Sequence, residues 1–121
     1  MEDRVTTPPE VQPYLEVLGA ELAIRFFLEF GGTGLYMPTR ATRRGSDIAN
    51  FLGTEMALAL GKKLGSGTIK IPLAKRWIAQ YLRIEKGESI SKICRTIHMT
   101  ETTVRGYVQG RRADRQLSFD M

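Results

Sequence analysis

Hydrophobic positions divide the chain into helical stretches and short extended runs. Between residues 14 and 30, apolar side chains recur every three or four positions, which predicts an amphipathic helix. Its expected inward residues are Leu15, Leu18, Leu22, Phe26 and Phe30. A glycine pair at 31–32 predicts the end of this helix, and residues 35–37 form an extended run closed by Pro38. Residues 1–13 hold three of the five prolines and few apolar side chains, which predicts a flexible N-terminal tail.

The same pattern then occurs a second time. Residues 17–38 read VLGAELAIRFFLEFGGTGLYMP, and residues 51–72 read FLGTEMALALGKKLGSGTIKIP, aligned without a gap. We interpret this as two helix–glycine turn–strand–proline units, a supersecondary duplication with too few copies for a solenoid. The basic loop PTRATRRGS joins them, and Ser46 is a candidate N-cap for the second helix. In the second strand, Thr68 and Lys70 are expected on the face opposite Ile69 and Ile71.

The two short strands predict self-association. An isolated two-stranded pair is marginally stable in water, and pairing between two chains would close the open strand edges. We therefore expect a homodimer built on residues 14–72, with strand pairing inside a monomer as the alternative. The expected interface residues are Leu15, Leu18, Leu22, Phe26, Phe30, Leu35, Met37, Leu52, Met56, Ile69 and Ile71.

The segment after Pro72 predicts a second domain over residues 73–112, followed by a C-terminal tail at 113–121. A basic helix from about residue 73 to 86 carries an apolar stripe, and Gly87 ends it. That stripe is Trp77, Ile78, Tyr81 and Leu82. The fold class is accordingly mainly α with short β-strands: a duplicated helix–glycine turn–strand dimerisation region before a C-terminal helix-turn-helix.

Residues 90–108, ISKICRTIHMTETTVRGYV, carry the helix-turn-helix pattern. Ser89 is the expected cap of a first helix whose inward residues are Ile90, Ile93, Cys94 and Ile97. Thr100 caps a second helix that buries Val104, Tyr107 and Val108. The first turn position, usually glycine, is His98, which is among the few other residues that adopt positive φ with some frequency.

The outward side chains of this segment suit DNA, since hydroxyls, amides and guanidinium groups bond base edges and phosphates. The candidate DNA-binding residues are Lys92, Arg95, Thr100, Thr102, Thr103, Arg105, Gly106, Gln109, Arg111 and Arg112. Similar helix pairs also occur in bundles that bind nothing, which is the competing interpretation.

Charge is distributed unevenly. The net charge of +5 comes from 18 Lys and Arg against 13 Asp and Glu. Residues 1–38 sum to −4, residues 39–72 to +4 and residues 73–116 to +6, and Asp120 supplies the last −1. Such an asymmetry is typical of a chain in which one region binds nucleic acid, although a basic face can also be merely solvated.

Taken together, these motifs resemble the Mor transcription activator family, the phage middle- and late-gene activators. The matching features are FGGTGLYMP, its echo GSGTIKIP and the C-terminal GESISKICRTIHMTETTVRGYV, within about residues 14–110. The resemblance implies an intertwined homodimer on a dyad-symmetric double-stranded promoter site, and recruitment of RNA polymerase. It also implies DNA backbone contacts near the domain junction, at Ser66, Gly67, Thr68 and Lys70. The basic side chains of Lys75 and Arg76 complete this junction set.

Other classes of function find little support in the residues. His98 and the one cysteine, Cys94, are too few for a metal site or a nucleophile with its base, so we expect no enzyme, cofactor or small-molecule substrate. No apolar run reaches the roughly 18 residues that span a bilayer, and we expect a cytoplasmic, nucleoid-associated protein. The leading hypothesis is a sequence-specific activator of phage or prophage type. The alternatives are a protein-interaction module, such as an anti-repressor, and a nonspecific nucleic-acid binder.

Overall fold

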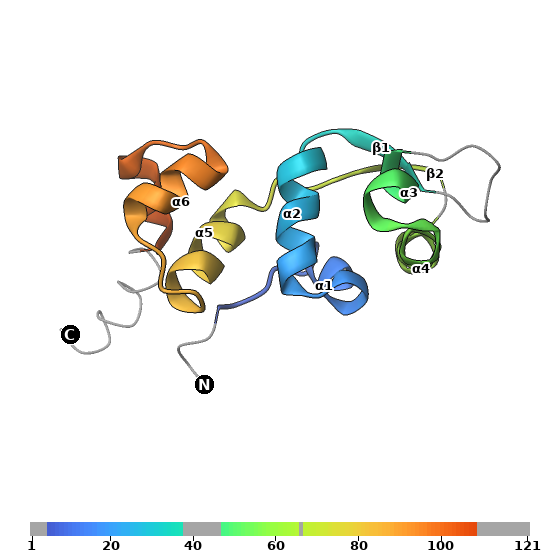
Figure 1. The fold of residues 1–121 in the computed structure, drawn as a ribbon, viewed down its shortest axis with the longest axis horizontal. Helices are drawn as coiled ribbons and strands as arrows, with labels where there is room; N and C mark the ends of the chain where they lie inside the picture. The colour runs from blue at the N-terminus through green and yellow to red at the C-terminus, as the bar shows by residue number, and fades with distance from the viewer. Residues whose placement is uncertain (1–4, 38–46, 66, 109–121) are drawn as a thin grey trace. The chain divides into compact units, whose positions relative to one another are not determined.

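The computed structural model describes residues 5–37, 47–65 and 67–108 of the chain. They are mainly helical and include one antiparallel two-stranded sheet (Figure 1). The chain divides between Ala74 and Lys75 into two compact units, close to the boundary predicted after residue 72. Within the described residues, no helix has the length and apolar character needed to cross a bilayer.

The first unit, Thr7–Ala74, contains two successive helix–helix–strand segments. The first segment consists of α1 (Gln12–Leu18), α2 (Ala20–Phe30) and β1 (Gly34–Met37). The second consists of α3 (Asp47–Leu52), α4 (Thr54–Leu64) and β2 (Gly67–Lys70). The repeat in the sequence is therefore also a repeat of secondary structure. Ser46, the expected cap of the second helix, lies outside the described residues.

The prediction of one continuous helix over residues 14–30 is wrong. The helix breaks at Gly19, which has φ 80° and ψ 163°, a combination open essentially only to glycine. Gly53, the matching residue of the second segment, separates α3 from α4 in the same way, with φ 90° and ψ 154°. The break changes which side chains point inward: Leu18 and Phe26 are buried as predicted, but Leu15, Leu22 and Phe30 are only half-buried. Residues that the periodicity did not select are buried instead: Tyr14, Ala23, Ile24 and Phe27.

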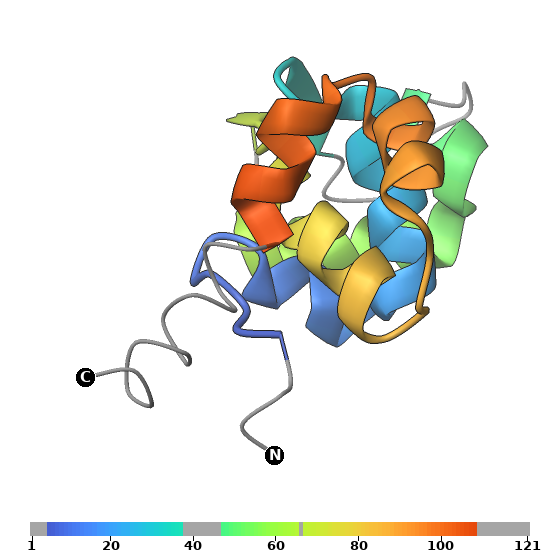
Figure 2. The same cartoon turned by 90° about the vertical axis from the view of Figure 1, so that its left-hand side faces the viewer.

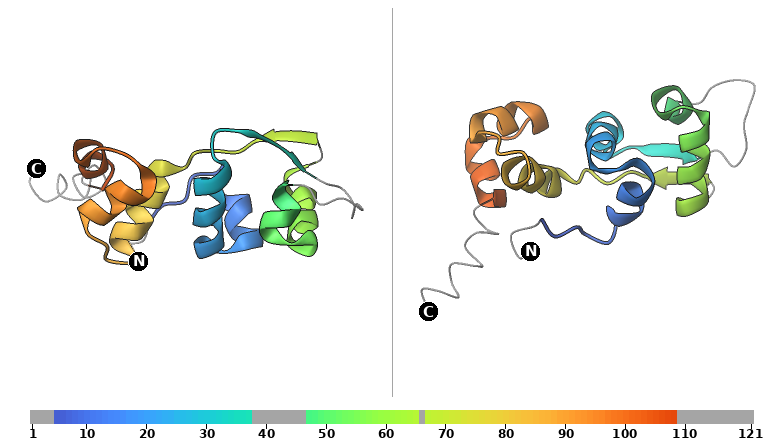
Figure 3. Two further views of the ribbon diagram at one scale, coloured as in Figure 1. Left: turned by 45° about the horizontal axis from the view of Figure 1, so that its top comes forward. Right: turned by 60° about the horizontal axis from the view of Figure 1, so that its bottom comes forward.

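The two strands pair within one chain, which is the alternative that the sequence left open. β1 and β2 run antiparallel, with Leu35 opposite Ile69 and Tyr36 opposite Thr68 (Figure 3). Beyond the strands, the Gly32 N–H donates to the Ile71 carbonyl at 2.7 Å. The Ile71 N–H in turn donates to the Thr33 carbonyl at 2.9 Å. The sheet therefore forms without a second copy of the chain.

The interior of the first unit contains several of the side chains predicted at the dimer interface. Phe26, Met37 and Ile71 are fully buried in one chain, and Leu18 and Leu35 nearly so. The remaining ones, Leu15, Leu22, Phe30, Leu52, Met56 and Ile69, are half-buried. Of the predicted interface residues, this second group keeps most of the surface that a second chain could cover while the fold is retained.

Ordered structure begins before the predicted boundary at residue 14. Val11 is fully buried, and the Tyr14 ring packs against Phe26 and Phe27 with centroid distances of 5.8 and 4.9 Å. Burial raises the pKa of the Tyr14 hydroxyl from 10.0 to about 12, because the charged phenolate loses its hydration. Val11 is thus part of the core, and the tail predicted over residues 1–13 is wrong for its last three residues.

Candidate nucleic acid interface

The second unit places a three-residue turn between two helices that pack on α5 (Lys75–Ile84). Trp77, Ile78 and Leu82 of α5 are buried, as the apolar stripe predicted, and Tyr81 is half-buried. Gln80 is also buried, and its side-chain amide donates to the Tyr107 carbonyl at 3.0 Å. This bond ties α5 to a helix far along the chain, and nothing in the local pattern had identified Gln80.

The first of the two helices, α6 (Ile90–Ile97), begins as predicted. The Ser89 hydroxyl oxygen accepts from the Lys92 N–H at 3.1 Å, which satisfies one of the unpaired donors at a helix start. Ile93 and Ile97 are fully buried, whereas Ile90 and Cys94 are half-buried. The predicted inward face is therefore confirmed for Ile93 and Ile97 and only in part for Ile90 and Cys94.

The turn depends on a left-handed residue at its first position. His98 has φ 58° and ψ 51°, and its N–H donates to the Cys94 carbonyl. The predicted positive φ is confirmed. Met99, the next residue, is half-buried, and its sulfur accepts from the Lys75 ammonium at 3.7 Å. This contact joins the middle of the turn to the first residue of α5.

Residues 101–108 form the second helix, drawn in red-orange in Figure 2. The Thr100 hydroxyl accepts from the Thr103 N–H at 3.3 Å, which confirms the predicted cap. The Val104 N–H donates to the Thr100 carbonyl at 3.0 Å. Val104 is fully buried and Val108 nearly so, while Tyr107 is half-buried. One face of this helix is thus fixed against the core of the unit.

The opposite face of the 101–108 helix lies open to solvent. Glu101, Thr102, Arg105 and Gly106 are exposed, whereas Thr103 is half-buried. The Thr100 hydroxyl donates to the Thr103 hydroxyl at 3.0 Å, so both hydroxyls belong to the cap in the free protein. Three further candidates, Gln109, Arg111 and Arg112, lie outside the described residues.

Arg105 is held by a carboxylate on its own helix. The guanidinium lies 2.5 Å from the Glu101 carboxylate one turn earlier, and both side chains are more than half exposed. Exposed pairs at this spacing contribute only about 0.3–0.5 kcal/mol. Arg105 can therefore exchange this partner for a phosphate or a base at little cost. The sequence placed Glu101 at the start of this helix, where a carboxylate suits the positive helix end, but its pairing with Arg105 was not predicted, although the four-residue spacing was visible.

Other basic side chains of the unit have similarly weak partners. Lys92 lies 3.8 Å from the Glu88 carboxylate, and Arg95 donates to the Ser91 hydroxyl at 3.1 Å. The Arg76 guanidinium lies over the Tyr107 ring, 5.8 Å from its centroid. Residues 75–108 carry seven basic and three acidic side chains. This unit thus presents an excess of positive charge with no strongly buried ion pair among its described contacts.

The junction set divides between the two units. Thr68 and Lys70 are exposed on β2 and Gly67 is half-buried, while Ser66 lies outside the described residues. Lys75 and Arg76 belong to α5, where Lys75 is half-buried and Arg76 exposed. β2 therefore offers one ammonium group and one hydroxyl to a partner.

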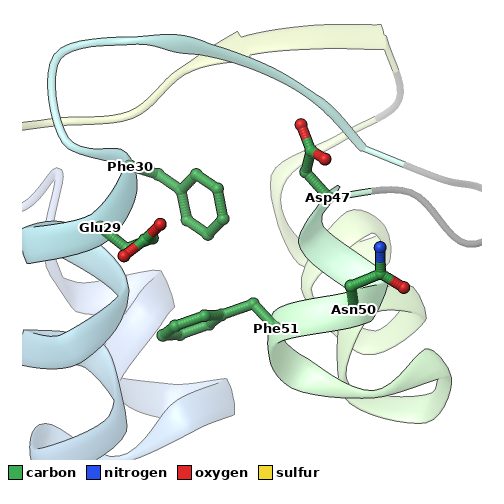
Figure 4. Close-up of a pocket in the computed structure, with 5 residues that line it drawn as sticks. All are labelled: Glu29, Phe30, Asp47, Asn50 and Phe51. Carbon is green, nitrogen blue, oxygen red and sulfur yellow. The ribbon is translucent and has the colours of Figure 1, made fainter.

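The first unit contains a pocket of about 420 Å³ whose charged lining residues are acidic, in contrast to the basic side chains of the second unit (Figure 4). Phe30 and Phe51 line it with rings at 5.5 Å between centroids. Glu29, Asp47 and Asn50 supply its polar groups. Among the described residues that line it, two are carboxylates and none is basic, so this part of the lining is unsuited to a phosphate. Among the described residues, the second unit carries seven basic side chains and the first unit four.

Comparisons of the chain with models of protein families, with curated proteins and with solved structures find no match. The resemblance to the Mor family therefore depends on the motifs quoted above. In the part of the chain that the structure describes, no group of three His, Cys, Asp or Glu side chains is placed to hold a metal ion. The candidate site is thus defined by its polar and basic helix face.

Proposed function

We propose that this chain is a sequence-specific DNA-binding transcription activator of phage or prophage type. In this proposal residues 90–108 are a helix-turn-helix, and the 101–108 helix is the one that enters the major groove. The protein binds a dyad promoter site as a homodimer and recruits RNA polymerase. The dyad and the polymerase come from the resemblance to the Mor family.

The observation that carries the proposal is the two-sided character of the 101–108 helix. Its inner face is anchored by Val104, Val108 and the bond from Gln80, while its outer face exposes Thr102, Arg105 and Gly106. A groove-reading helix needs this combination, since rigid support keeps the contacting groups in register and short polar side chains let the backbone come close.

Homodimerisation is supported by surface that remains apolar in the single chain. Tyr36 on β1, Leu28 on α2 and Leu73 have exposed fractions of 59%, 41% and 53%. Both outer edges of a two-stranded sheet also keep unpaired backbone groups that a second chain can cover. Light scattering after size exclusion should give twice the chain mass of 13.6 kDa at micromolar concentration, and a monomer mass would contradict the dimer.

DNA binding is tested by selecting preferred sites from a random duplex library and measuring their affinity at several salt concentrations. The proposal predicts a preferred site with two half-sites roughly 10 base pairs or a multiple apart. It also predicts that log affinity falls by about 0.9 per log unit of salt for each neutralised phosphate. Equal affinity for all sequences would instead identify a nonspecific binder, and no duplex binding at low salt would favour a protein-interaction module.

Two variants separate the contact face from general charge effects. Arg105→Ala should weaken binding to the preferred site by about 1–3 kcal/mol, if the guanidinium pairs with a base. Arg25→Ala removes an equal charge from an exposed position on α2 of the first unit and should have a much smaller effect. If both variants weaken binding equally, the contact face is not on the 101–108 helix.

Activation is tested separately by transcription in vitro from a template that carries the selected site next to a weak promoter. Added protein should raise transcript yield from this template and leave a template with a scrambled site unchanged. A fall in transcript yield would show that the protein represses, even if its DNA specificity is as proposed.

A further inference from the structure

We infer that Glu101 is a specificity-determining residue that acts against incorrect DNA sequences, an inference that rests on the proposed DNA-binding function. Its carboxylate lies at the start of the 101–108 helix, on the same exposed face as Thr102 and Arg105. An acidic side chain here is unexpected if the face only attracts DNA, because it places a negative charge where phosphates come close. Its position therefore requires an explanation beyond general attraction.

The contact with Arg105 supplies that explanation. The Glu101 carboxylate and the Arg105 guanidinium lie 2.5 Å apart, with exposed side-chain fractions of 61% and 51%. The pair is weak because solvent screens it, so DNA can replace it. Until then, Glu101 holds one nitrogen of the guanidinium, Nη2, and its negative charge weakens the attraction of Arg105 for any phosphate within reach.

The chemistry of base edges determines when the exchange is favourable. A guanidinium bonds the O6 and N7 acceptors of guanine, and a carboxylate accepts from the N4 amino group of cytosine. A site that offers both groups satisfies Arg105 and Glu101 together. A site that presents acceptors to Glu101 leaves its carboxylate desolvated and unpaired, which discriminates against that sequence.

A purely structural role makes a different prediction. A carboxylate in the first turn of a helix interacts favourably with the positive helix end and with a cation one turn later. If that were its whole contribution, Glu101→Gln would lower the unfolding temperature slightly and leave sequence preference unchanged. Sequence preference is therefore the measurement that separates the two roles.

The experiment compares sites selected from one random duplex library by the wild-type chain and by Glu101→Gln. We expect the variant to lose preference at one or two base pairs in each half-site. Its affinity for nonspecific duplex should rise, and its ratio of specific to nonspecific affinity should fall about tenfold. Circular dichroism and thermal unfolding verify that the variant is folded.

Glu85→Gln is the matched control. Glu85 is exposed just after α5 in the same unit. Its replacement by glutamine removes the same charge as Glu101→Gln but leaves the contact between Glu101 and Arg105 in place. It should change affinity for all duplexes alike and keep the selected sequence. If Glu101→Gln selects the same sequence as the wild type with an unchanged ratio, Glu101 does not determine specificity, although the proposed function stands. If the wild type itself prefers no sequence, the proposed function and this inference both fail.

Discussion

Replacing Gly106 by alanine should make the protein more stable and a poorer DNA binder. Gly106 is exposed on the 101–108 helix, and a Cβ built there meets no other atom within 4 Å. Alanine is favoured over glycine inside a helix by about 0.8–1.0 kcal/mol. For a chain of this size, such a gain corresponds to a rise in unfolding temperature of roughly 3–6 °C.

The effect on DNA binding has the opposite sign because the open space beside Gly106 is where we place the duplex. A methyl group forced into a tightly packed contact costs about 1–3 kcal/mol. The dissociation constant for the preferred site should therefore rise about 5- to 150-fold, as measured by fluorescence anisotropy with a labelled duplex.

Asn50→Ala is the control for a general link between stability and binding. Asn50 is exposed within α3 of the first unit, and the substitution should also raise stability through helix propensity, by about 0.5 kcal/mol. It should leave DNA affinity unchanged. If Gly106→Ala raises the unfolding temperature but binds the preferred duplex as tightly as the wild type, DNA does not come close to residue 106. The contact face would then have to be assigned elsewhere.

Three further substitutions test the fold itself. Gly53→Ala should destabilise the protein by about 1–3 kcal/mol in urea unfolding, since φ 90° and ψ 154° strain any residue with a side chain even where space is open. An unchanged urea midpoint would contradict the break between α3 and α4. His98→Gly should raise the free energy of unfolding by about 0.5 kcal/mol, because the relief of left-handed backbone strain exceeds the entropy that glycine adds to the unfolded chain. A lower free energy of unfolding would show that the imidazole makes a stabilising contact. Because the pKa of Tyr14 is raised, the folded chain keeps a proton that the unfolded chain releases between pH 10 and about 12. The free energy of unfolding therefore falls over this range, by at most about 1.4 kcal/mol per pH unit. Tyr14→Phe should show a shallower fall over this range, and equal slopes for the two proteins would refute the assignment.

Local chemistry made much of the second unit predictable from sequence. Ser89 and Thr100 cap helices because a hydroxyl followed by an amphipathic stretch satisfies backbone donors within three residues. The left-handed turn at His98 followed from the same short-range logic. Such features depend on residues only a few positions apart in the chain, so the order of residues is enough to predict them.

Other features depended on choices that a linear pattern does not contain. The apolar periodicity continues across Gly19, so it could not show that the backbone changes direction there. Pairing of β1 with β2 inside one chain and pairing between chains use the same residues, and the sequence could not select between them. The bond from Gln80 to the Tyr107 carbonyl joins positions far apart in the chain and depends on how the helices cross.

Charge gives a further reason to place DNA binding on the second unit. In the full sequence, Thr7–Ala74 carries seven basic and six acidic side chains, whereas residues 75–121 carry ten basic and five acidic ones. Duplex DNA presents one negative charge per roughly 1.7 Å of its axis, so affinity grows with each phosphate that a cation neutralises. In the first unit, two carboxylates line the aromatic pocket. The Lys63 ammonium pairs with Glu16 and lowers the pKa of that carboxyl, but this pair is also exposed and does not distinguish the two units. The weak, exposed partners of Lys92, Arg95 and Arg105 leave those cations able to exchange toward phosphates, which together with the larger positive charge supports our proposal that the second unit binds DNA.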